Sequence, residues 1–199
     1  GIGISHIYID SEANIEKAVS ISSNAKLSNP YVCNALDTIL VNKTIADEFL
    51  PQIVEKLSSH GVEIRCDKQA LNIIGSKKGN VSHATDNDWG KEFLSLTLSI
   101  KIVENVEEAI SHIQHFTFRA GHTDTIVTEN NLIAQVFLKQ VDSSVVMVNA
   151  STRFNDGGQL GLGAEVAVST DKLHARGPMG LKELTSYKWI IFGQGHIRE

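Results

Sequence analysis

Apolar and polar residues alternate along the chain in blocks whose spacing predicts strands and helices in turn. Residues 5–10, SHIYID, alternate with the two-residue period of a strand, and residues 13–21 then place apolar side chains at helical spacing until the break at Asn29-Pro30. The same reasoning predicts further strands at 38–41, 62–66, 96–103, 125–128 and 145–148, and further helices at 45–57, 105–113 and 131–140.

This succession predicts an α/β fold with a mostly parallel sheet and crossover helices, because such helices connect parallel strands. Pro51 is expected to kink or split the helix at 45–57. Residues 74–90 and 149–180 are rich in Gly and polar side chains, and we expect both to form loops. Loops of that length inside a compact domain are usually either functional or disordered, so the second one is a candidate site region.

Composition narrows the classes of partner. The chain has 199 residues, of which 42% are hydrophobic and 21% charged, as in an ordinary globular domain. Its net charge of -5 and its scattered Lys and Arg argue against nucleic-acid and membrane partners. No apolar run approaches the roughly 20 residues of a membrane span, and no signal peptide is evident. We therefore expect a cytoplasmic protein with reduced cysteines.

Histidines and cysteines do not suggest a metal site. His112 and His115 are three residues apart on an expected helix, but no partner at ligand spacing accompanies them, so we expect a solvated helix face. Cys66 lies in a strand-like run and is expected to be a structural thiol.

Cys33 carries the main chemical question, because a free cysteine is either a small buried hydrophobe or a nucleophile. It follows Asn29-Pro30 and precedes the apolar run 38–41. A cysteine that enters a helical turn after such a loop would meet the positive end of the helix dipole and free N–H groups, which lower a thiol pKa and can face an oxyanion.

Four long motifs favour the nucleophile. Residues 1–41, GIGISHIYIDSEANIEKAVSISSNAKLSNPYVCNALDTILV, are followed in order by VMVNASTRF at 146–154, GLGAEVAVST at 161–170 and HARGPMGL at 174–181. Together they resemble the gamma-glutamyl phosphate reductase family, the proline-biosynthesis branch of the aldehyde dehydrogenase superfamily. The reductase half of the bifunctional pyrroline-5-carboxylate synthase shares these motifs. The resemblance covers essentially the whole chain.

The resemblance implies an NADPH-dependent reduction of L-glutamyl 5-phosphate to L-glutamate 5-semialdehyde and phosphate. Cys33 would attack the acyl phosphate and form a thioester that the nicotinamide reduces by hydride. Glu92, in KEFLSL, resembles the acidic residue that holds the nicotinamide ribose, although a solvated Glu at a helix start would look the same. The candidate substrate-binding residues, each of which could instead only support its loop, are Asn149, Ser151, Thr152, Arg153, Glu165, His174 and Arg176.

The chain resembles only the C-terminal half of such an enzyme. It contains no dinucleotide fingerprint, and GLG at 161–163 is better explained as a tight turn. We expect residues 1–180 to form a catalytic domain and residues 181–199 a C-terminal strand or tail, which includes the strand-like run 187–192 and can support a homo-oligomer. The NADPH site would lie mainly in an N-terminal domain absent from this chain, so the fragment alone should be inactive.

Two segments depart from the family pattern, namely GGQL at 157–160 and FTFRAGHTD at 116–124.

Three other interpretations of the function of the chain remain open. An ordinary NAD(P) aldehyde dehydrogenase fragment would need a Glu base that we cannot assign. A non-catalytic assembly module would use residues 187–192. A Cys/His hydrolase would pair Cys33 with His174, but no orienting third residue is evident.

Overall fold

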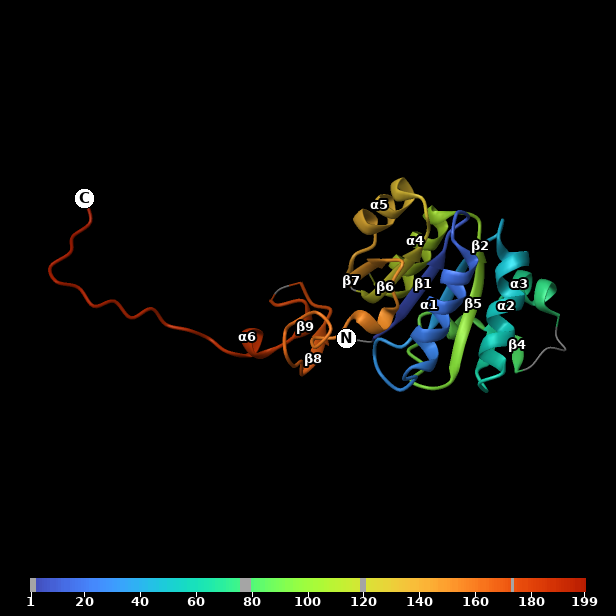
Figure 1. The fold of residues 1–199 in the computed structure, drawn as a ribbon, viewed down its shortest axis with the longest axis horizontal. Helices are drawn as coiled ribbons and strands as arrows, with labels where there is room; N and C mark the ends of the chain where they lie inside the picture. The colour runs from blue at the N-terminus through green and yellow to red at the C-terminus, as the bar shows by residue number, and fades with distance from the viewer. Residues whose placement is uncertain (1–2, 76–79, 119–120, 173) are drawn as a thin grey trace.

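Seven parallel strands form one sheet in the order β4-β3-β5-β2-β1-β6-β7 in the computed structural model, which describes residues 3–75, 80–118, 121–172 and 174–199 (Figure 1). The mostly parallel α/β fold predicted from the sequence is confirmed. The strands are β1 (Ser5–Ile9), β2 (Thr38–Asn42), β3 (Glu63–Cys66), β4 (Val81–His83), β5 (Thr97–Val103), β6 (Gly121–Val127) and β7 (Ser143–Val148).

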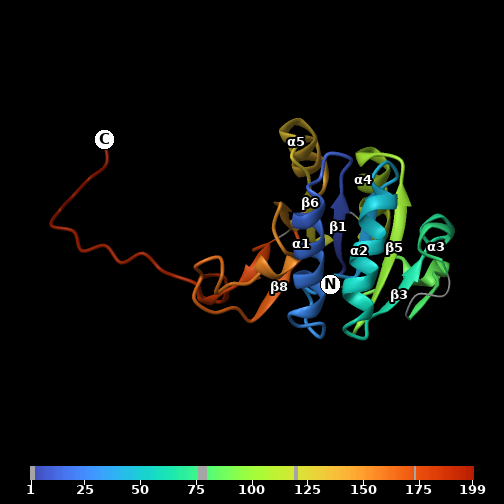
Figure 2. The same cartoon turned by 45° about the vertical axis from the view of Figure 1, so that its right-hand side comes forward.

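Helices cover both faces of the sheet (Figures 1 and 2). Side chains of a strand point alternately to the two faces, so Ile7 and Ile9 of β1 pack with α1 and α2, whereas Tyr8 packs with α4 and α5. Each face therefore has its own apolar core. The helices are α1 (Ile15–Leu27), α2 (Ala46–Ser58), α3 (Lys68–Ile74), α4 (Val106–Phe116), α5 (Asn131–Gln140) and the short α6 (Leu181–Leu184).

Short polar side chains begin four of these helices. Asn14 accepts a hydrogen bond from the backbone N–H of Lys17 at 2.9 Å, and Asn105 accepts one from Glu108 at 2.9 Å. Asp67 and Asn130 cap α3 and α5 in the same way. Each cap satisfies an N–H group that has no partner inside the helix.

Some local expectations were wrong and others were narrowed. α2 runs without interruption through Pro51, which excludes the split expected there as one of two outcomes. The expected loop at 74–90 contains β4 and a 3-10 turn at Asp86–Asp88, while its residues 76–79 lie outside the described part. A three-residue strand carries too short a pattern to be recognised from the sequence.

The loop expected at 149–180 contains a 3-10 turn, η2 (Thr152–Phe154), and an antiparallel pair, β8 (Ala167–Ser169) and β9 (Gly177–Met179). This pair stands beside the main sheet, and the chain then extends away from the body (Figure 2). Residues 187–192 form no strand within the described structure, since no neighbouring strand pairs with their backbone. Their side chains are exposed, with Phe192 94% exposed.

Among the described residues, no helix is both long and apolar enough to cross a lipid bilayer. The same ranges contain no group of three or more His, Cys, Asp or Glu side chains arranged to hold a metal ion.

Candidate functional site

Cys33 lies in the turns that connect α1 to β2, at the amino ends of β1 and β2. The hydroxyl of Ser5, the first residue of β1, donates to the carbonyl oxygen of Cys33 at 3.4 Å. The thiol is half-buried and free. The loop that carries it is therefore held against the end of a central strand but remains accessible.

The electrostatic surroundings of Cys33 differ from those expected. Within residues 3–75 no helix begins at Cys33, because α1 ends at Leu27 and the chain reaches β2 through turns. Burial raises the pKa of the Cys33 thiol, and the carboxylates of Glu92 and Glu165 raise it further, against smaller opposing effects of its own backbone N–H and of Arg153. The prediction of a thiol activated by a helix dipole was wrong. The resting side chain is a protonated thiol at neutral pH.

Glu92 lies next to the nucleophile, although 59 positions separate them in the sequence. A Cβ atom on Gly3 would lie 2.6 Å from Oε1 of Glu92 and 3.0 Å from Cβ of Cys33. Only glycine fits between the two side chains without displacing one of them. The sequence motif KEFLSL pointed to Glu92, but nothing in it predicted the part played by Gly3.

Asp37 holds the Glu92 segment in place, and it was not among the site residues predicted from the sequence. Its Oδ1 accepts from the backbone N–H of Phe93 at 2.9 Å and its Oδ2 from that of Ser5 at 3.1 Å. Burial raises its pKa to about 6, opposed by the N–H groups of Phe93 and Ser5 and by the charge of Lys26. An Asp directly before a buried apolar strand was the available signal.

The 3-10 turn of the motif NASTRF lies against α1 and β1, and two of its side chains, Thr152 and Arg153, act on the Cys33 region. Thr152 is fully buried and donates to the carbonyl oxygen of Asn34 at 2.7 Å. Ser151 is buried and accepts from the backbone N–H of Arg153 at 3.3 Å, which caps η2. Both hydroxyls make hydrogen bonds to the backbone of the protein, so their role in this structure is to support the loop.

Arg153 has a different environment, because its guanidinium is partly exposed. Nε donates to the hydroxyl of Ser28 at 3.2 Å. It lines a cavity of about 330 Å³ next to the end of α1, together with Asn24, Ser28, Phe154, Asp156 and Gln159. Arg153 is therefore available to an anionic ligand.

Asn149 is not brought to this site. Its amide oxygen accepts from the backbone N–H of Thr128 at 3.0 Å, and its Nδ2 donates to the carbonyl oxygen of Thr128 at 2.8 Å. Thr128 follows the carboxyl end of β6, whereas Cys33 lies at the opposite, amino ends of the strands. Both polar groups of Asn149 serve to join two loops.

The three remaining candidates from the sequence have separate environments. Glu165 contributes to the field at Cys33 and accepts from the backbone N–H of Gly157 at 2.8 Å. Arg176 donates from Nη1 to Asp142 Oδ1 at 2.7 Å and from Nη2 to the carbonyl oxygen of Asp142 at 2.8 Å, so it fixes its own loop. His174 is exposed.

Two other expectations concern residues away from Cys33. Cys66 is fully buried, and burial raises its pKa to about 12, as expected for a structural thiol. His112 does not lie on a solvated face: it is on the buried side of α4 and only 6% exposed, and burial lowers its pKa to about 2. Its neighbour His115 is exposed, so the expectation was wrong for His112 alone.

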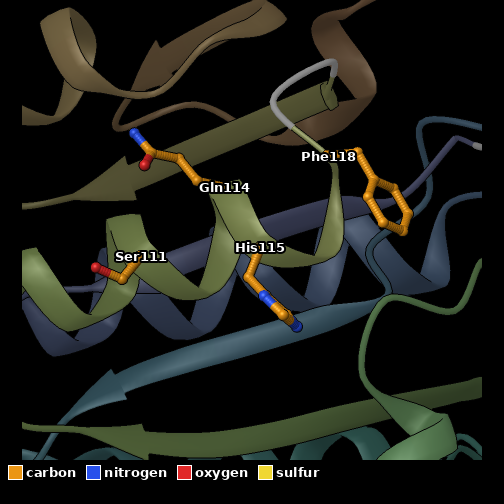
Figure 3. Close-up of a pocket in the computed structure, with 4 residues that line it drawn as sticks. All are labelled: Ser111, Gln114, His115 and Phe118. Atoms are coloured by element: carbon orange, nitrogen blue, oxygen red, sulfur yellow. The ribbon is translucent and has the colours of Figure 1, made fainter.

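A second cavity, of about 460 Å³, lies along the outer side of α4 and the turn after it (Figure 3). Ser111, Gln114, His115 and Phe118 line it, and none of them was a candidate site residue. Residues 119–120, within the segment that departs from the family pattern, lie outside the described structure.

Comparison with known proteins decides the relationship. No protein-family model matches the chain. Gamma-glutamyl phosphate reductase of Dehalococcoides mccartyi is 54% identical over 199 residues, which is 100% of this chain and 46% of that protein. That of Caldanaerobacter subterraneus is 53% identical over 199 residues and 47% of its length. The chain is a close relative of gamma-glutamyl phosphate reductases. It spans about half the length of the curated relatives it matches.

Solved structures agree. The crystal structure of gamma-glutamyl phosphate reductase from Thermotoga maritima superposes with a TM-score of 0.90 and 48% identity, over 100% of this chain and 47% of that one. An acetylating aldehyde dehydrogenase from Geobacillus thermoglucosidasius has a TM-score of 0.73 at 18% identity, which supports the aldehyde dehydrogenase-like fold alone. The resemblance predicted from the sequence is confirmed.

Proposed function

We propose that this chain supplies the cysteine-bearing half of an NADPH-dependent gamma-glutamyl phosphate reductase. The reaction would convert L-glutamyl 5-phosphate into L-glutamate 5-semialdehyde and phosphate in proline biosynthesis. The observation that carries the proposal is identity above 50% along the whole chain to reductases of this name, combined with an accessible thiol at Cys33 beside Glu92 and within the field of Arg153.

Cys33 is the proposed nucleophile. Its sulfur forms a bond to the acyl carbon while the bond from that carbon to the phosphate oxygen breaks, and the thiol proton leaves with the phosphate. Burial, Glu92 and Glu165 raise the pKa of the Cys33 thiol, so the resting thiol carries a proton that must leave during the attack. The leaving phosphate can accept that proton. The product of this step is a thioester on Cys33.

Release of the product returns Cys33 to its resting state. NADPH, when bound, supplies a hydride to the thioester carbon. The carbon–sulfur bond then breaks, the aldehyde leaves, and the sulfur regains a proton. The backbone N–H of Cys33 favours negative charge on the sulfur, since it acts to lower the thiol pKa, and we propose that the same N–H stabilises the carbonyl oxygen as negative charge develops there.

Two of the charged side chains around the thiol suit particular groups of a glutamyl phosphate. Arg153 lines the cavity beside α1 and suits the phosphate or the carboxylate of the substrate, since a guanidinium binds either group with two hydrogen bonds. Glu165 would repel both anions and suits the substrate ammonium. Ser151 and Thr152 act indirectly in this proposal, by shaping the loop that presents Arg153.

Glu92 is the proposed cofactor contact within this chain. Its half-buried carboxylate lies beside Cys33, and the missing Cβ of Gly3 leaves it room, so it can accept hydrogen bonds from a ribose. The remaining cofactor contacts would come from an N-terminal domain that precedes residues 1–180 in the enzyme. We propose a cytoplasmic location for that enzyme.

The exposed C-terminal segment is the proposed route to a homo-oligomer. Tyr187, Trp189 and Phe192 are 84%, 84% and 94% exposed. So many exposed large apolar side chains within six residues are unusual on the surface of a monomer. Residues 181–199 would then gain a strand partner only in the assembly.

Substitution of Cys33 in a full-length reductase that carries this segment tests the proposal. Cys33→Ser should lower the rate of reduction by several orders of magnitude with an unchanged circular dichroism spectrum, as for other covalent nucleophiles. Cys66→Ser is the matched control and should retain activity. A Cys33→Ser enzyme with a tenth of the wild-type rate or more would remove Cys33 from the reaction.

Aldehyde oxidation is a second candidate, because Glu92 and Glu165 both act on Cys33 electrostatically and either carboxylate is a conceivable base for water. Incubation of the full-length enzyme with glutamate semialdehyde and NADP+ distinguishes the two. Formation of glutamyl phosphate only when inorganic phosphate is present supports the reductase, whereas phosphate-independent formation of glutamate supports oxidation.

A further inference from the structure

Two buried amides tie the Cys33 loop to a distant part of the chain. Asn34 directly follows Cys33, and its Nδ2 donates to the carbonyl oxygen of Asn155 at 2.9 Å. In return, Thr152 donates from Oγ1 to the carbonyl oxygen of Asn34 at 2.7 Å. Asn34 is 4% exposed, and Thr152 and Asn155 are fully buried. One segment, 152–155, therefore binds both the side chain and the backbone of the residue next to the nucleophile.

The connection continues to the sheet. Asn155 Nδ2 donates to the hydroxyl of Thr123 at 2.6 Å, and the same hydroxyl lies 2.7 Å from Nδ1 of His122. Thr123 and His122 belong to β6, which pairs with β1 on one side and β7 on the other. A chain of hydrogen bonds thus leads from a rigid strand to the loop of Cys33.

Stability alone does not explain these amides. The Oδ1 atoms of Asn34 and Asn155 are both buried and have no hydrogen-bond partner among the described residues. A buried acceptor without a partner costs free energy. The Cys33 turns contain no helix or strand, and backbone hydrogen bonds hold mainly their end, as from Leu36 N–H to the carbonyl oxygen of Ala25 at 3.0 Å. The side-chain hydrogen bonds of Asn34 and Thr152 act on the residue directly after Cys33.

We infer that Asn34 and Asn155 are positioning residues, which hold the Cys33 loop in one geometry through Thr152 and Thr123. Neither residue need touch the substrate. The inference rests on the proposed role of Cys33 as nucleophile and adds the residues that set the place of its sulfur.

Thiol reactivity of the 199-residue chain tests the inference without any cofactor. The rate of Cys33 alkylation by iodoacetamide is measured from pH 6 to 11 in wild type, Asn34→Ala and Asn155→Ala. Burial is the first cause of the raised pKa of Cys33, so a released loop should expose the thiol. We expect alkylation at pH 7 at least about threefold faster in both variants, with the pH profile moved toward that of an ordinary cysteine.

Cys66 reports on the fold in the same experiment, because it is fully buried and should stay unmodified while the protein is folded. Asn42→Ala is the matched control: Asn42 is 5% exposed, its amide donates to Tyr8 at 3.2 Å, and it lies at the carboxyl end of β2, away from Cys33. Its Cys33 profile should equal that of wild type.

Variants that modify Cys66 have lost the fold, and in that case Thr152→Val and Thr123→Val give the answer, since each removes one hydroxyl at nearly constant shape. Folded variants of the network with a wild-type Cys33 profile would overturn the inference. So would an equal change in Asn42→Ala. Full turnover by Cys33→Ser would instead refute the proposed function and leave the thiol measurements unaffected.

Discussion

Gly3 packs directly against Cys33, since a Cβ atom on Gly3 would lie 3.0 Å from both Cβ and the carbonyl oxygen of Cys33. The first described residue of the chain thus shapes the space around the thiol. Because the same Cβ would lie 2.6 Å from Glu92 Oε1, Gly3→Ala should displace the Glu92 carboxylate and shift the Cys33 loop.

We expect Gly3→Ala in the full-length enzyme to raise the KM for NADPH about tenfold, equivalent to ~1.4 kcal/mol. Steady-state kinetics with varied NADPH measures it. Gly193→Ala is the control, because its added Cβ would meet nothing closer than 3.8 Å. A normal KM for NADPH in a folded Gly3→Ala enzyme would contradict the assigned place of Glu92.

The field of the two carboxylates gives a prediction for thiol reactivity. Glu165→Gln removes one of the causes that raise the Cys33 pKa, after burial and Glu92. The thiolate fraction at pH 7 should rise, and alkylation of Cys33 should become faster by a factor of about 2 to 10. Glu183→Gln, in α6, is the control. Slower alkylation in Glu165→Gln would mean that the carboxylate assists the thiol instead.

Arg153→Lys tests substrate binding. Lysine keeps the charge but loses the planar pair of donors, so kcat/KM for glutamyl phosphate should fall by about 1.5–3 kcal/mol in transition-state binding, roughly 10- to 150-fold. Arg198→Lys in the exposed tail should have no effect. An unchanged kcat/KM for Arg153→Lys would make Arg153 a support of its loop, through Ser28.

Lys26 makes the stability of the fold depend on pH. It is fully buried, its Nζ donates to the carbonyl oxygen of Leu36 at 2.8 Å, and burial lowers its pKa to about 8 from 10.5, opposed by Asp37. Between pH 8 and 10.5 the unfolded chain holds more protons on Lys26 than the folded chain, so this residue makes stability rise with pH by ~3 kcal/mol across the window.

The buried thiol of Cys66 and the hydroxyl of Tyr8 act with the opposite sign, because their pKa values are raised. The contribution of Lys26 is therefore measured as the difference in free energy of unfolding between wild type and a variant without Lys26. Urea unfolding of wild type and Lys26→Met at pH 8 and pH 10.5 should show wild type gaining ~3 kcal/mol relative to the variant. A constant difference between the two proteins would show that Lys26 is charged in the folded state throughout.

How far the sequence predicted the fold depends on the length of each pattern. The period of β1 and the apolar stripes of α2 and α4 are local and long, so they were recognised. β4 and β9 have three residues each, and a pattern that short carries no period. Residues 187–192 have the composition of a strand, but a strand also needs a partner.

The sequence predicted those residues of the candidate site that stand in a recognisable motif, but not the contacts between them. Cys33 and Glu92 stand in recognisable motifs. Their proximity depends on Gly3 and on the two hydrogen bonds of Asp37, which join segments far apart in sequence. Asn149 shows the converse: it is only two positions before Ser151, yet it pairs with Thr128 at the far end of the sheet.

The raised pKa of Cys33 also bears on how the protein survives oxidants. The thiolate is the form that attacks peroxide and breaks its O–O bond, and the first product is a sulfenic acid that can be oxidised further and irreversibly. Burial together with Glu92 and Glu165 keeps the resting sulfur protonated. The surroundings that slow the attack of Cys33 on an alkylating reagent therefore also shield it from peroxide, so the resting nucleophile is chemically durable between turnovers.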